Sequence, residues 1–152
     1  YTCLFPSYLS VTDILINGIY WEKGIPPLFS LEDMRGEKFC IQVIADITCD
    51  KQGSVPCNLG ATSINDPVYG VDKQTVKITA PYLPGTIDIM SVDNLPNELP
   101  RDASRYFGEQ LIKYVLPELL HEKSELIERA TILKNGKLMK PFNYLKEYAY
   151  GK

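Results

Sequence analysis

The sequence lacks the features of two large classes of proteins. No apolar run approaches the roughly 20 residues that a membrane-spanning helix needs, so we expect no membrane partner. Basic residues are not in excess, because 16 Lys and Arg stand against 19 Asp and Glu, for a net charge of −3. A protein without a basic field is a poor candidate for binding nucleic acid, and we expect no such partner.

Several motifs of catalysis and phosphate binding are missing as well. The sequence has no GxGxxG turn, no GxSxG nucleophile elbow and no HExxH zinc motif. The four cysteines (Cys3, Cys40, Cys49 and Cys57) form no CxxC pair, so we predict no metal site. Cys40 and Cys49 flank an apolar run, as buried free thiols do. This cysteine usage predicts a cytoplasmic protein.

What is present fits a folded domain. The chain has 152 residues, the length of one domain. Hydrophobic residues make up 45% of it and charged residues 23%, which excludes disorder for most of the chain. Because the first residue is Tyr1 rather than methionine, we expect a processed or partial chain.

Three short apolar runs predict buried strands, at 14–16, 41–45 and 87–92. The first two lack polar alternation, which is typical of strands covered on both faces in a parallel sheet. Between them, Ser30 is a suitable helix N-cap and Gly36 a suitable stop. A short helix at this place would complete a βαβ unit.

The remaining segments predict hairpins and helices. An apolar stripe that includes Phe107 and Leu111 predicts a helix of about 19 residues, with Pro117 in its last turn. Further elements are expected at the following places: a hairpin over 68–79, a helix over 124–129, a hairpin around 135–136 and a final helix over 142–148.

Polar residues follow each predicted strand: 17–18 after the first, 46–50 after the second and 93–94 after the third. In an open parallel sheet, ligands bind beyond the carboxyl ends of the strands. We therefore expect two acids and two amides to face a common crevice. The alternative is structural, because residue type alone favours turn-forming roles for Asp50 and Asp93.

The only histidine, His121, closes the long predicted helix, where a cation suits the helix dipole. We interpret it as a structural residue. No Ser-His-Asp or Cys-His set can be assembled around it.

Several ordered motifs resemble the alanine dehydrogenase and saccharopine dehydrogenase superfamily. They are Asp13–Gly18, Ala45–Asp50 with Gly53, Thr62–Tyr69, Ser91–Pro96, Leu99–Ser104 and Tyr106–Gly108. The stretch from Ser91 onward is similar to the lysine-forming saccharopine dehydrogenases and to the lysine–oxoglutarate reductase domain. The resemblance extends over about residues 11–148.

The resemblance implies an α/β fold that contains the last strands of a Rossmann-like parallel sheet, a long crossover helix and the C-terminal part of a substrate domain. Residues 1–100 would be the C-terminal part of a Rossmann-like NAD(P)-binding domain, and residues 101–152 the long helix and the C-terminal segment of the substrate domain. The family's glycine-rich turn and its catalytic lysine and histidine would lie on a missing N-terminal half, in the same or a separate chain. We therefore expect this chain alone to be incomplete and inactive. A homo-oligomer is one of the expected assemblies.

The resemblance also implies site residues and a cofactor, NAD or NADP. Asp50 is similar in position to the family's active-site aspartate. The cofactor contacts implied by the resemblance are Ile47 and Val92 as apolar walls of the nicotinamide pocket, with Asp93, Asn94 and Leu95 on the following loop. An acid at Asp93 favours the saccharopine branch, since alanine dehydrogenases usually carry a small residue there.

The activity implied is a reversible hydride transfer in which an amino acid and a 2-oxo acid condense to an imine that is then reduced. The favoured hypothesis is a saccharopine dehydrogenase-like enzyme that acts on lysine and 2-oxoglutarate. The alternative is an alanine dehydrogenase-like enzyme. Two further hypotheses stay open. One is a noncatalytic module that kept the scaffold, and the other is a subunit of a split enzyme.

Overall fold

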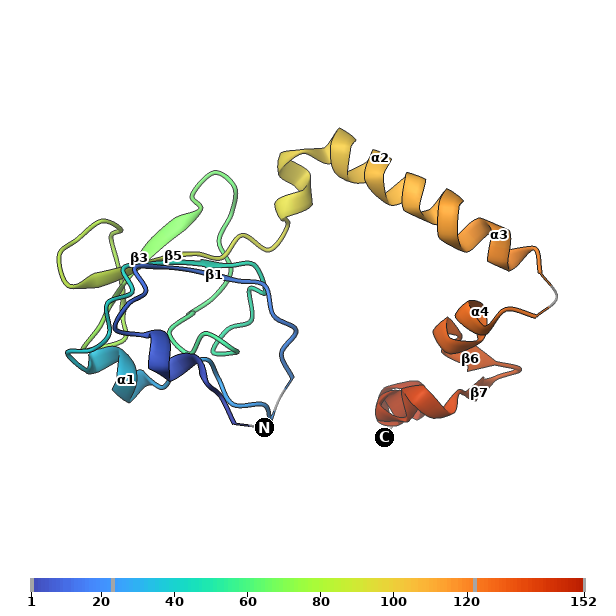
Figure 1. The fold of residues 1–152 in the computed structure, drawn as a ribbon, viewed down its shortest axis with the longest axis horizontal. Helices are drawn as coiled ribbons and strands as arrows, with labels where there is room; N and C mark the ends of the chain where they lie inside the picture. Colours follow the sequence, from blue (N-terminus) through green and yellow to red (C-terminus); the bar gives the residue numbers. More distant parts are fainter. Residues whose placement is uncertain (1, 23, 122, 152) are drawn as a thin grey trace. The chain divides into compact units, whose positions relative to one another are not determined.

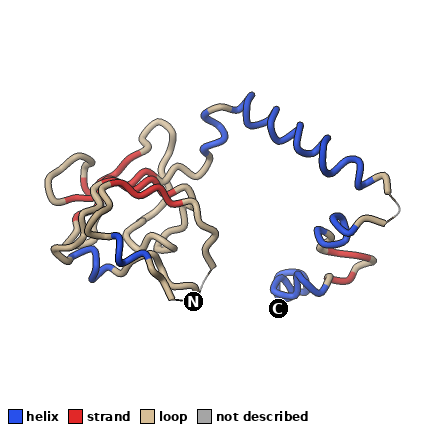
Figure 2. The backbone as a smooth tube through the Cα atoms, viewed as in Figure 1, coloured by secondary structure: helices blue, strands red, loops and turns tan. Residues whose placement is uncertain are grey.

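The structure is a computed structural model that describes residues 2–22, 24–121 and 123–151. It is a mixed α/β fold with two compact units, Tyr1–Glu98 and Leu99–Lys152. The main sheet belongs to the first unit, and the second unit is mostly helical (Figures 1 and 2). The assignment of these units to a cofactor domain and a substrate domain stays a prediction.

The described residues of the first unit form five strands and three short helical segments. In chain order they are η1 (Phe5–Tyr8), β1 (Ile14–Asn17), α1 (Leu31–Arg35), β2 (Val43–Asp46), β3 (Val68–Asp72), β4 (Ile78–Thr79), β5 (Thr86–Met90) and η2 (Leu95–Glu98). The sheet order is β1-β2-β5-β3-β4. The third predicted strand therefore occurs, but it ends at Met90 rather than at Val92.

Strands β1, β2 and β5 run parallel, which confirms the prediction from their apolar runs. Asn17 of β1 is the register partner of Asp46 of β2, and Ala45 is the partner of Met90 of β5. Strand β3 pairs antiparallel with both β5 and β4, so the predicted hairpin over 68–79 is present. The sheet is thus parallel on one side and antiparallel on the other.

Helix α1 lies between β1 and β2 in the chain and completes the expected βαβ unit. Ser30 is its N-cap: the Ser30 hydroxyl accepts from the Asp33 backbone N–H at 3.0 Å, and the Ser30 backbone N–H donates to the Asp33 carboxylate at 2.8 Å. This reciprocal pair is a capping box, which satisfies N–H groups that the first helical turn leaves free. The residue pattern around Ser30 therefore predicted the helix start correctly.

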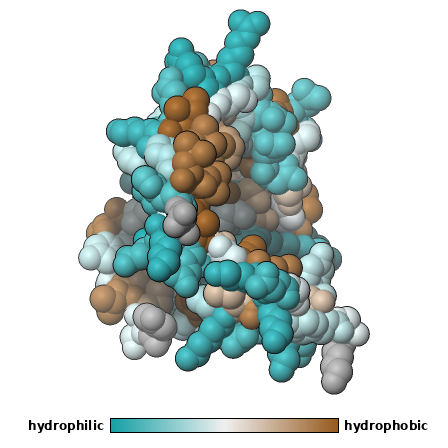
Figure 3. Space-filling model, turned by 90° about the vertical axis from the view of Figure 1, so that its right-hand side faces the viewer, coloured by the Kyte–Doolittle hydropathy of each residue, from teal (hydrophilic) through white to brown (hydrophobic). Residues whose placement is uncertain are grey.

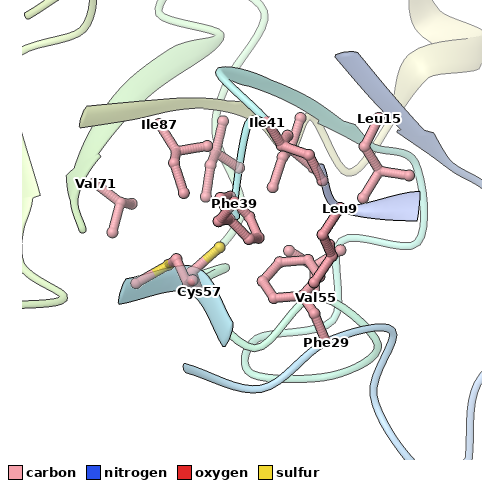
Figure 4. Packing of buried hydrophobic residues seen from close by; sticks show 12 residues of the cluster. Leu9, Leu15, Phe29, Phe39, Ile41, Val55, Cys57, Val71 and Ile87 are labelled. Carbon is pink, nitrogen blue, oxygen red and sulfur yellow. The ribbon is translucent and has the colours of Figure 1, made fainter. Parts of the chain in front are cut away.

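One face of the sheet packs on the core. Val71 and Ile87 point from the sheet toward Phe39 and Cys57 (Figure 4), and the Phe29 and Phe39 rings meet at 5.0 Å between centroids. The core comprises Leu9, Leu15, Phe29, Met34, Phe39, Ile41, Ile44, Val55, Cys57, Val71, Ile87 and Ile89.

The other face of the parallel strands is open. Ile14 and Ile16 of β1 are 63% and 73% exposed, and Val43 of β2 is 39% exposed. The expectation that these strands are covered on both faces is therefore wrong for the described residues. Uniformly apolar strands need burial on both faces, but among the described residues Ile14, Ile16 and Val43 keep much of their surface exposed.

The cysteine pattern also differs from expectation. All four cysteines are free thiols, but the fully buried one is Cys57, whereas Cys40 and Cys49 are only half-buried. Cys57 lies in the irregular segment that crosses beneath the sheet, where the sequence shows no periodic pattern. An apolar run beside a cysteine was therefore a poor guide to its burial.

The long predicted helix of the second unit is present but not uniform. It comprises α2 (Pro100–Gln110), a π-helical turn η3 (Leu111–Val115) and α3 (Leu116–Leu119). The Leu116 N–H donates to the Leu111 carbonyl, five residues back. Pro117 follows at once and has no N–H to donate, so the wider turn accommodates the proline at the place where a kink was expected.

The rest of the second unit follows the predicted order. Helix α4 (Glu125–Ala130) is capped by Ser124, and strands β6 (Leu133–Lys134) and β7 (Lys137–Leu138) form the expected hairpin. Both turn residues of this hairpin have positive φ, as an Asn-Gly turn favours. The final segment is a 3-10 helix, η4 (Lys140–Leu145), followed by α5 (Lys146–Tyr150).

Large apolar side chains remain at the surface, as the brown areas of Figure 3 show. On the long helix, Phe107, Ile112 and Leu119 are each more than half exposed. Within the described residues, most of the predicted apolar stripe is therefore exposed. None of the helices in the described part of the chain has the length and apolar character needed to cross a bilayer.

Candidate functional site

The carboxyl ends of β1, β2 and β5 meet at one edge of the sheet because the three strands are parallel and adjacent. The segments that follow these ends start side by side at that edge. The edge is extended by a parallel bridge between Thr62 and Val92, where the Thr62 N–H donates to the Ser91 carbonyl at 2.8 Å. The expected gathering of strand ends is thus confirmed.

A buried carboxylate lies at the centre of this edge. Asp46, the last residue of β2, has no exposed surface. Its Oδ1 accepts hydrogen bonds from Asn17 Nδ2 at 2.8 Å and from the Thr48 hydroxyl at 2.7 Å. Its Oδ2 accepts one from Asn58 Nδ2 at 2.7 Å. The carboxylate therefore joins the end of β1 to the end of β2 and to the crossing segment below the sheet.

Asn58 extends this network to the third strand end. Its Nδ2 also donates to the Ser91 hydroxyl at 2.9 Å, directly after β5. Its Oδ1 accepts from the Tyr69 hydroxyl at 3.0 Å and from the Gly60 N–H at 2.9 Å. Burial raises the pKa of Tyr69, so this hydroxyl stays protonated and acts as a donor at neutral pH.

Asn17 completes the network on the side of β1. It is 1% exposed, and its amide nitrogen also lies 2.8 Å from the Ser54 hydroxyl, which is fully buried. Every buried side-chain nitrogen and oxygen in the described residues has a hydrogen-bond partner. The cluster is thus a satisfied buried polar network, which holds its members in fixed positions.

Cys49 connects the segment after β2 to the segment after β5. Its backbone has a φ of 58°, in the left-handed region. Its sulfur lies 3.1 Å from the Val92 carbonyl oxygen and 3.3 Å from the Asp46 carbonyl oxygen, so its single S–H has an acceptor on each segment. Burial raises the pKa of the Cys49 thiol, and the charges of Asp46, Asp93 and Asp50 raise it further. Both expected acids, Asp50 and Asp93, therefore lie in the electrostatic neighbourhood of Cys49.

The other expected site residues occupy the same edge. Val92 is 4% exposed and Ile47 is 42% exposed. Asp50, Asp93 and Asn94 are exposed, and Leu95 is half-buried at the start of η2. This edge therefore presents carboxylates, an amide and apolar surface to solvent above the buried network. Their roles toward a cofactor stay predictions.

The sequence motifs did not single out Asp46 at the end of β2 and pointed instead to Asp50 in the loop that follows. The sequence does contain a signal, because Asp46 and Asn17 are polar residues at the ends of two apolar runs. The third member, Asn58, lies in a segment without any pattern. Its contact with Asp46 spans 12 residues of sequence and follows only from the folded chain.

His121 lies outside this site, in the second unit. It is exposed and borders a hollow of about 780 Å³ that is also lined by Glu118, Ser124 and Met139. The Ser124 hydroxyl donates to the Glu118 carboxylate in this hollow. Within the described residues, no group of His, Cys, Asp and Glu side chains is arranged to hold a metal ion.

Comparison with curated proteins gives clear relatives. The chain is 30% identical to the mouse mitochondrial alpha-aminoadipic semialdehyde synthase, over 90% of this chain and 18% of the mouse protein. It is 32% identical to the alpha-aminoadipic semialdehyde synthase of Arabidopsis thaliana, over 88% of this chain and 13% of that protein. These relatives, with the fungal one described next, are members of the saccharopine dehydrogenase family.

A fungal relative carries that enzyme name itself. Saccharopine dehydrogenase (NAD(+), L-lysine-forming) of Emericella nidulans is 30% identical over 88% of this chain and 35% of its own length. The chain thus spans about a third or less of the length of each of these three relatives. No family model matches the chain. The similarity supports the saccharopine branch of the resemblance seen in the sequence motifs.

Proposed function

We propose that this chain is part of an NAD(P)-dependent oxidoreductase of amino acids that catalyses the reductive condensation of lysine with 2-oxoglutarate, or the reverse reaction. The observation that carries the proposal is the identity of about 30% with saccharopine dehydrogenases over most of the chain. The fungal relatives are named for NAD(+), which favours NAD over NADP. The similarity favours this substrate class over alanine and pyruvate.

In the proposal, the parallel part of the sheet is the end of a Rossmann-like domain, and the carboxyl edge of β1, β2 and β5 is the nicotinamide end of the cofactor site. Ligands of open parallel sheets bind at such an edge. Ile47 and Val92 would give apolar contact with the nicotinamide ring, and Asp93, Asn94 and Leu95 would contact the cofactor from the loop after β5. The edge fits this use because exposed Ile47 and exposed polar side chains occur together on it.

Bound NAD(P)H would supply the hydride, and the chain's own residues would orient and stabilise the reacting atoms. Asp50 is the proposed catalytic residue. A substrate imine is more electrophilic when protonated, and a carboxylate next to its nitrogen stabilises that positive charge. Asp50 is exposed at the edge, so its carboxylate is accessible to a substrate.

The remaining parts of the site would come from a segment outside these 152 residues. The proposal assigns to that segment the glycine-rich phosphate-binding turn and the lysine and histidine that transfer protons. The greater length of the relatives supports this assignment. Location in the cytoplasm stays a prediction from the cysteines, whereas the mouse relative is named as mitochondrial.

The test starts with the protein isolated from its source by an antibody against this chain. Its intact mass and peptide map show whether a glycine-rich segment belongs to the same chain or to a partner. The isolated protein is then assayed by NADH absorbance with lysine plus 2-oxoglutarate and, in parallel, with pyruvate plus ammonia. We expect oxidation of NADH with the first pair. Oxidation of NADH only with pyruvate plus ammonia would favour the alanine dehydrogenase-like alternative. No oxidation with either pair would leave the hypothesis of a noncatalytic module.

A further inference from the structure

Asp46 is a buried carboxylate whose partners are all neutral donors. Asn17 and Thr48 donate to one of its oxygens, and Asn58 donates to the other. Within the described part of the chain, no cation forms an ion pair with it. Burying a carboxylate without a counter-ion is costly, and an apolar side chain of similar size would avoid that cost. The position of this group therefore calls for a reason other than stability.

The network around Asp46 offers such a reason because it ties three strand ends together. Asn17 ends β1, Asp46 ends β2, and Asn58 passes the connection to Ser91, directly after β5. These are the strands whose carboxyl edge bears the expected site residues. No other hydrogen-bonded network that we find in the described residues joins all three ends through side chains.

Asp46 contacts the loop that carries Asp50 through both its carboxylate and its main-chain carbonyl. The Thr48 hydroxyl donates to the carboxylate oxygen Asp46 Oδ1, and the Cys49 sulfur lies 3.3 Å from the main-chain carbonyl oxygen of Asp46. Cys49 then has the left-handed backbone conformation that turns the chain toward Asp50. Asp50 itself closes the next turn, since its carbonyl accepts from the Gly53 N–H at 3.0 Å. The position of Asp50 thus depends on contacts that begin at Asp46.

We propose that Asp46 is a positioning residue: its buried carboxylate, held by Asn17, Thr48 and Asn58, fixes the 47–50 loop and so places Asp50 for catalysis. The catalytic part of this inference rests on the proposed function. A carboxylate is required because it accepts at both oxygens. An amide at residue 46 would direct an NH₂ group at one of the donors, which breaks a buried hydrogen bond.

The test uses Trp21, the only tryptophan of the chain, as a reporter of the loop. Its ring atom Cε3 lies 3.5 Å from the position that a Gly53 Cβ would occupy, so the indole packs beside the Asp50–Gly53 turn. In the 152-residue chain, the Asp46→Asn variant should show changed acrylamide quenching of Trp21 and a changed near-ultraviolet circular dichroism signal, well below its unfolding midpoint. The matched control is Asp13→Asn, at the amino end of β1, which should leave both signals unchanged.

Exchanging the side chains of residues 17 and 46 distinguishes a positioning role of Asp46 from a simple effect of lost charge or lost stability. In the double variant with Asn17→Asp and Asp46→Asn, the amide nitrogen at residue 46 can donate one hydrogen to the carboxylate at residue 17 and the other to the Thr48 hydroxyl, which then accepts. The amide oxygen at residue 46 still accepts from Asn58. The Trp21 signals should return toward those of the original protein. A double variant that resembles Asp46→Asn would overturn the inference, as would an Asp46→Asn protein that folds with unchanged Trp21 signals.

A milder variant covers the case in which Asp46→Asn does not fold. Thr48→Val keeps the shape of the side chain and removes only the hydroxyl that donates to Asp46. It should shift the Trp21 quenching in the same direction, and an unchanged signal would contradict the inference.

Kinetics on the complete enzyme tests the catalytic consequence. Asp46→Asn should lower kcat by about 10- to 100-fold, as a displaced catalytic group does, with a much smaller change in the KM for NADH and recovery in the exchanged double variant. A Trp21 response without any dehydrogenase activity in the original protein would refute the proposed function but not the control of the loop by Asp46. An active enzyme whose kcat does not change in Asp46→Asn would refute the positioning role alone.

Discussion

Asp50 and Gly53 are in such close contact that a methyl group at residue 53 would lie 2.5 Å from the Cβ of Asp50 and 3.1 Å from its carbonyl oxygen. Trp21 packs against the same turn, with its Cε3 atom 3.5 Å from the position of such a methyl group. Glycine is required here by space, because the backbone of residue 53 passes directly beside Asp50. The closeness makes the turn a sensitive point of the candidate site.

The first prediction concerns this contact. Gly53→Ala should displace Asp50 and lower the stability of the first unit, by about 1–3 kcal/mol as expected for an overpacked site. Urea unfolding followed by Trp21 fluorescence measures the loss. Gly18→Ala is the control, since a Cβ at residue 18 meets no atom within 4 Å. Equal stabilities of the two variants would contradict the close contact.

The second prediction concerns the start of α1. Ser30→Ala removes the hydroxyl that accepts from the Asp33 N–H and donates to the Asp33 carboxylate at 2.7 Å. The first unit should lose about 1 kcal/mol of unfolding free energy, the usual effect of losing an N-cap. Replacement of the exposed Ser10 by alanine should have little effect. Unfolding of Ser30→Ala and Ser10→Ala at the same urea concentration would contradict a stabilising role of the Ser30 cap.

The dependence of stability on acidic pH tests the same capping box, because Asp33 titrates in this range. The backbone N–H and the hydroxyl of Ser30 lower the pKa of Asp33 below its ordinary value of 3.8. A lowered folded-state pKa stabilises the protein above the unfolded value, and the stabilisation is lost as pH falls through the folded value. The stability difference between the original protein and Asp33→Asn should therefore be constant near neutral pH and shrink below about pH 4. A difference that stays constant down to pH 2 would exclude this role.

The sequence predicted the elements whose signals are local. The Ser30 cap, the Asn135-Gly136 turn and the parallel strands each depend on residues within a few positions of one another or on simple apolar patterns. Pro117 also marked the irregular place in the long helix, although only the structure shows that the chain forms a π turn there.

The candidate site was only partly predictable because its centre depends on distant residues. The strand ends were located correctly, but Asp46 contacts Asn17 across 29 residues of sequence and Asn58 contacts Ser91 across 33. Residue type does not distinguish an aspartate that is buried by such partners from one that is exposed, such as Asp50. Coverage of the sheet was misjudged for a related reason, because an apolar strand shows that a face requires a partner but not which segment provides it.

A fourth prediction tests the role proposed for Asp50. In the complete enzyme, Asp50→Asn should reduce turnover with lysine and 2-oxoglutarate by about 100-fold or more, because an oriented charge that stabilises the reacting imine is lost. Its thermal stability should change little, since the side chain is exposed. The control is Asp13→Asn, at the opposite edge of the sheet. Unchanged turnover in Asp50→Asn would remove the catalytic assignment.

The last prediction uses the alkaline titration of Cys57. The thiol is fully buried, and burial raises its pKa from 9.0 to about 12. Since the folded-state pKa is above the unfolded one, the unfolded chain releases the proton first as pH rises. The stabilisation is complete below about pH 9 and is lost between the two pKa values, with a slope of at most about 1.4 kcal/mol for each pH unit.

Cys57→Ala, which has no thiol to titrate, should lose less stability than the original protein between about pH 8 and about pH 10.5. Urea unfolding under reducing conditions, followed by Trp21 fluorescence, gives both slopes. Cys3→Ala, which keeps Cys57, should retain the slope of the original protein, and equal slopes in all three proteins would mean that Cys57 is accessible to solvent.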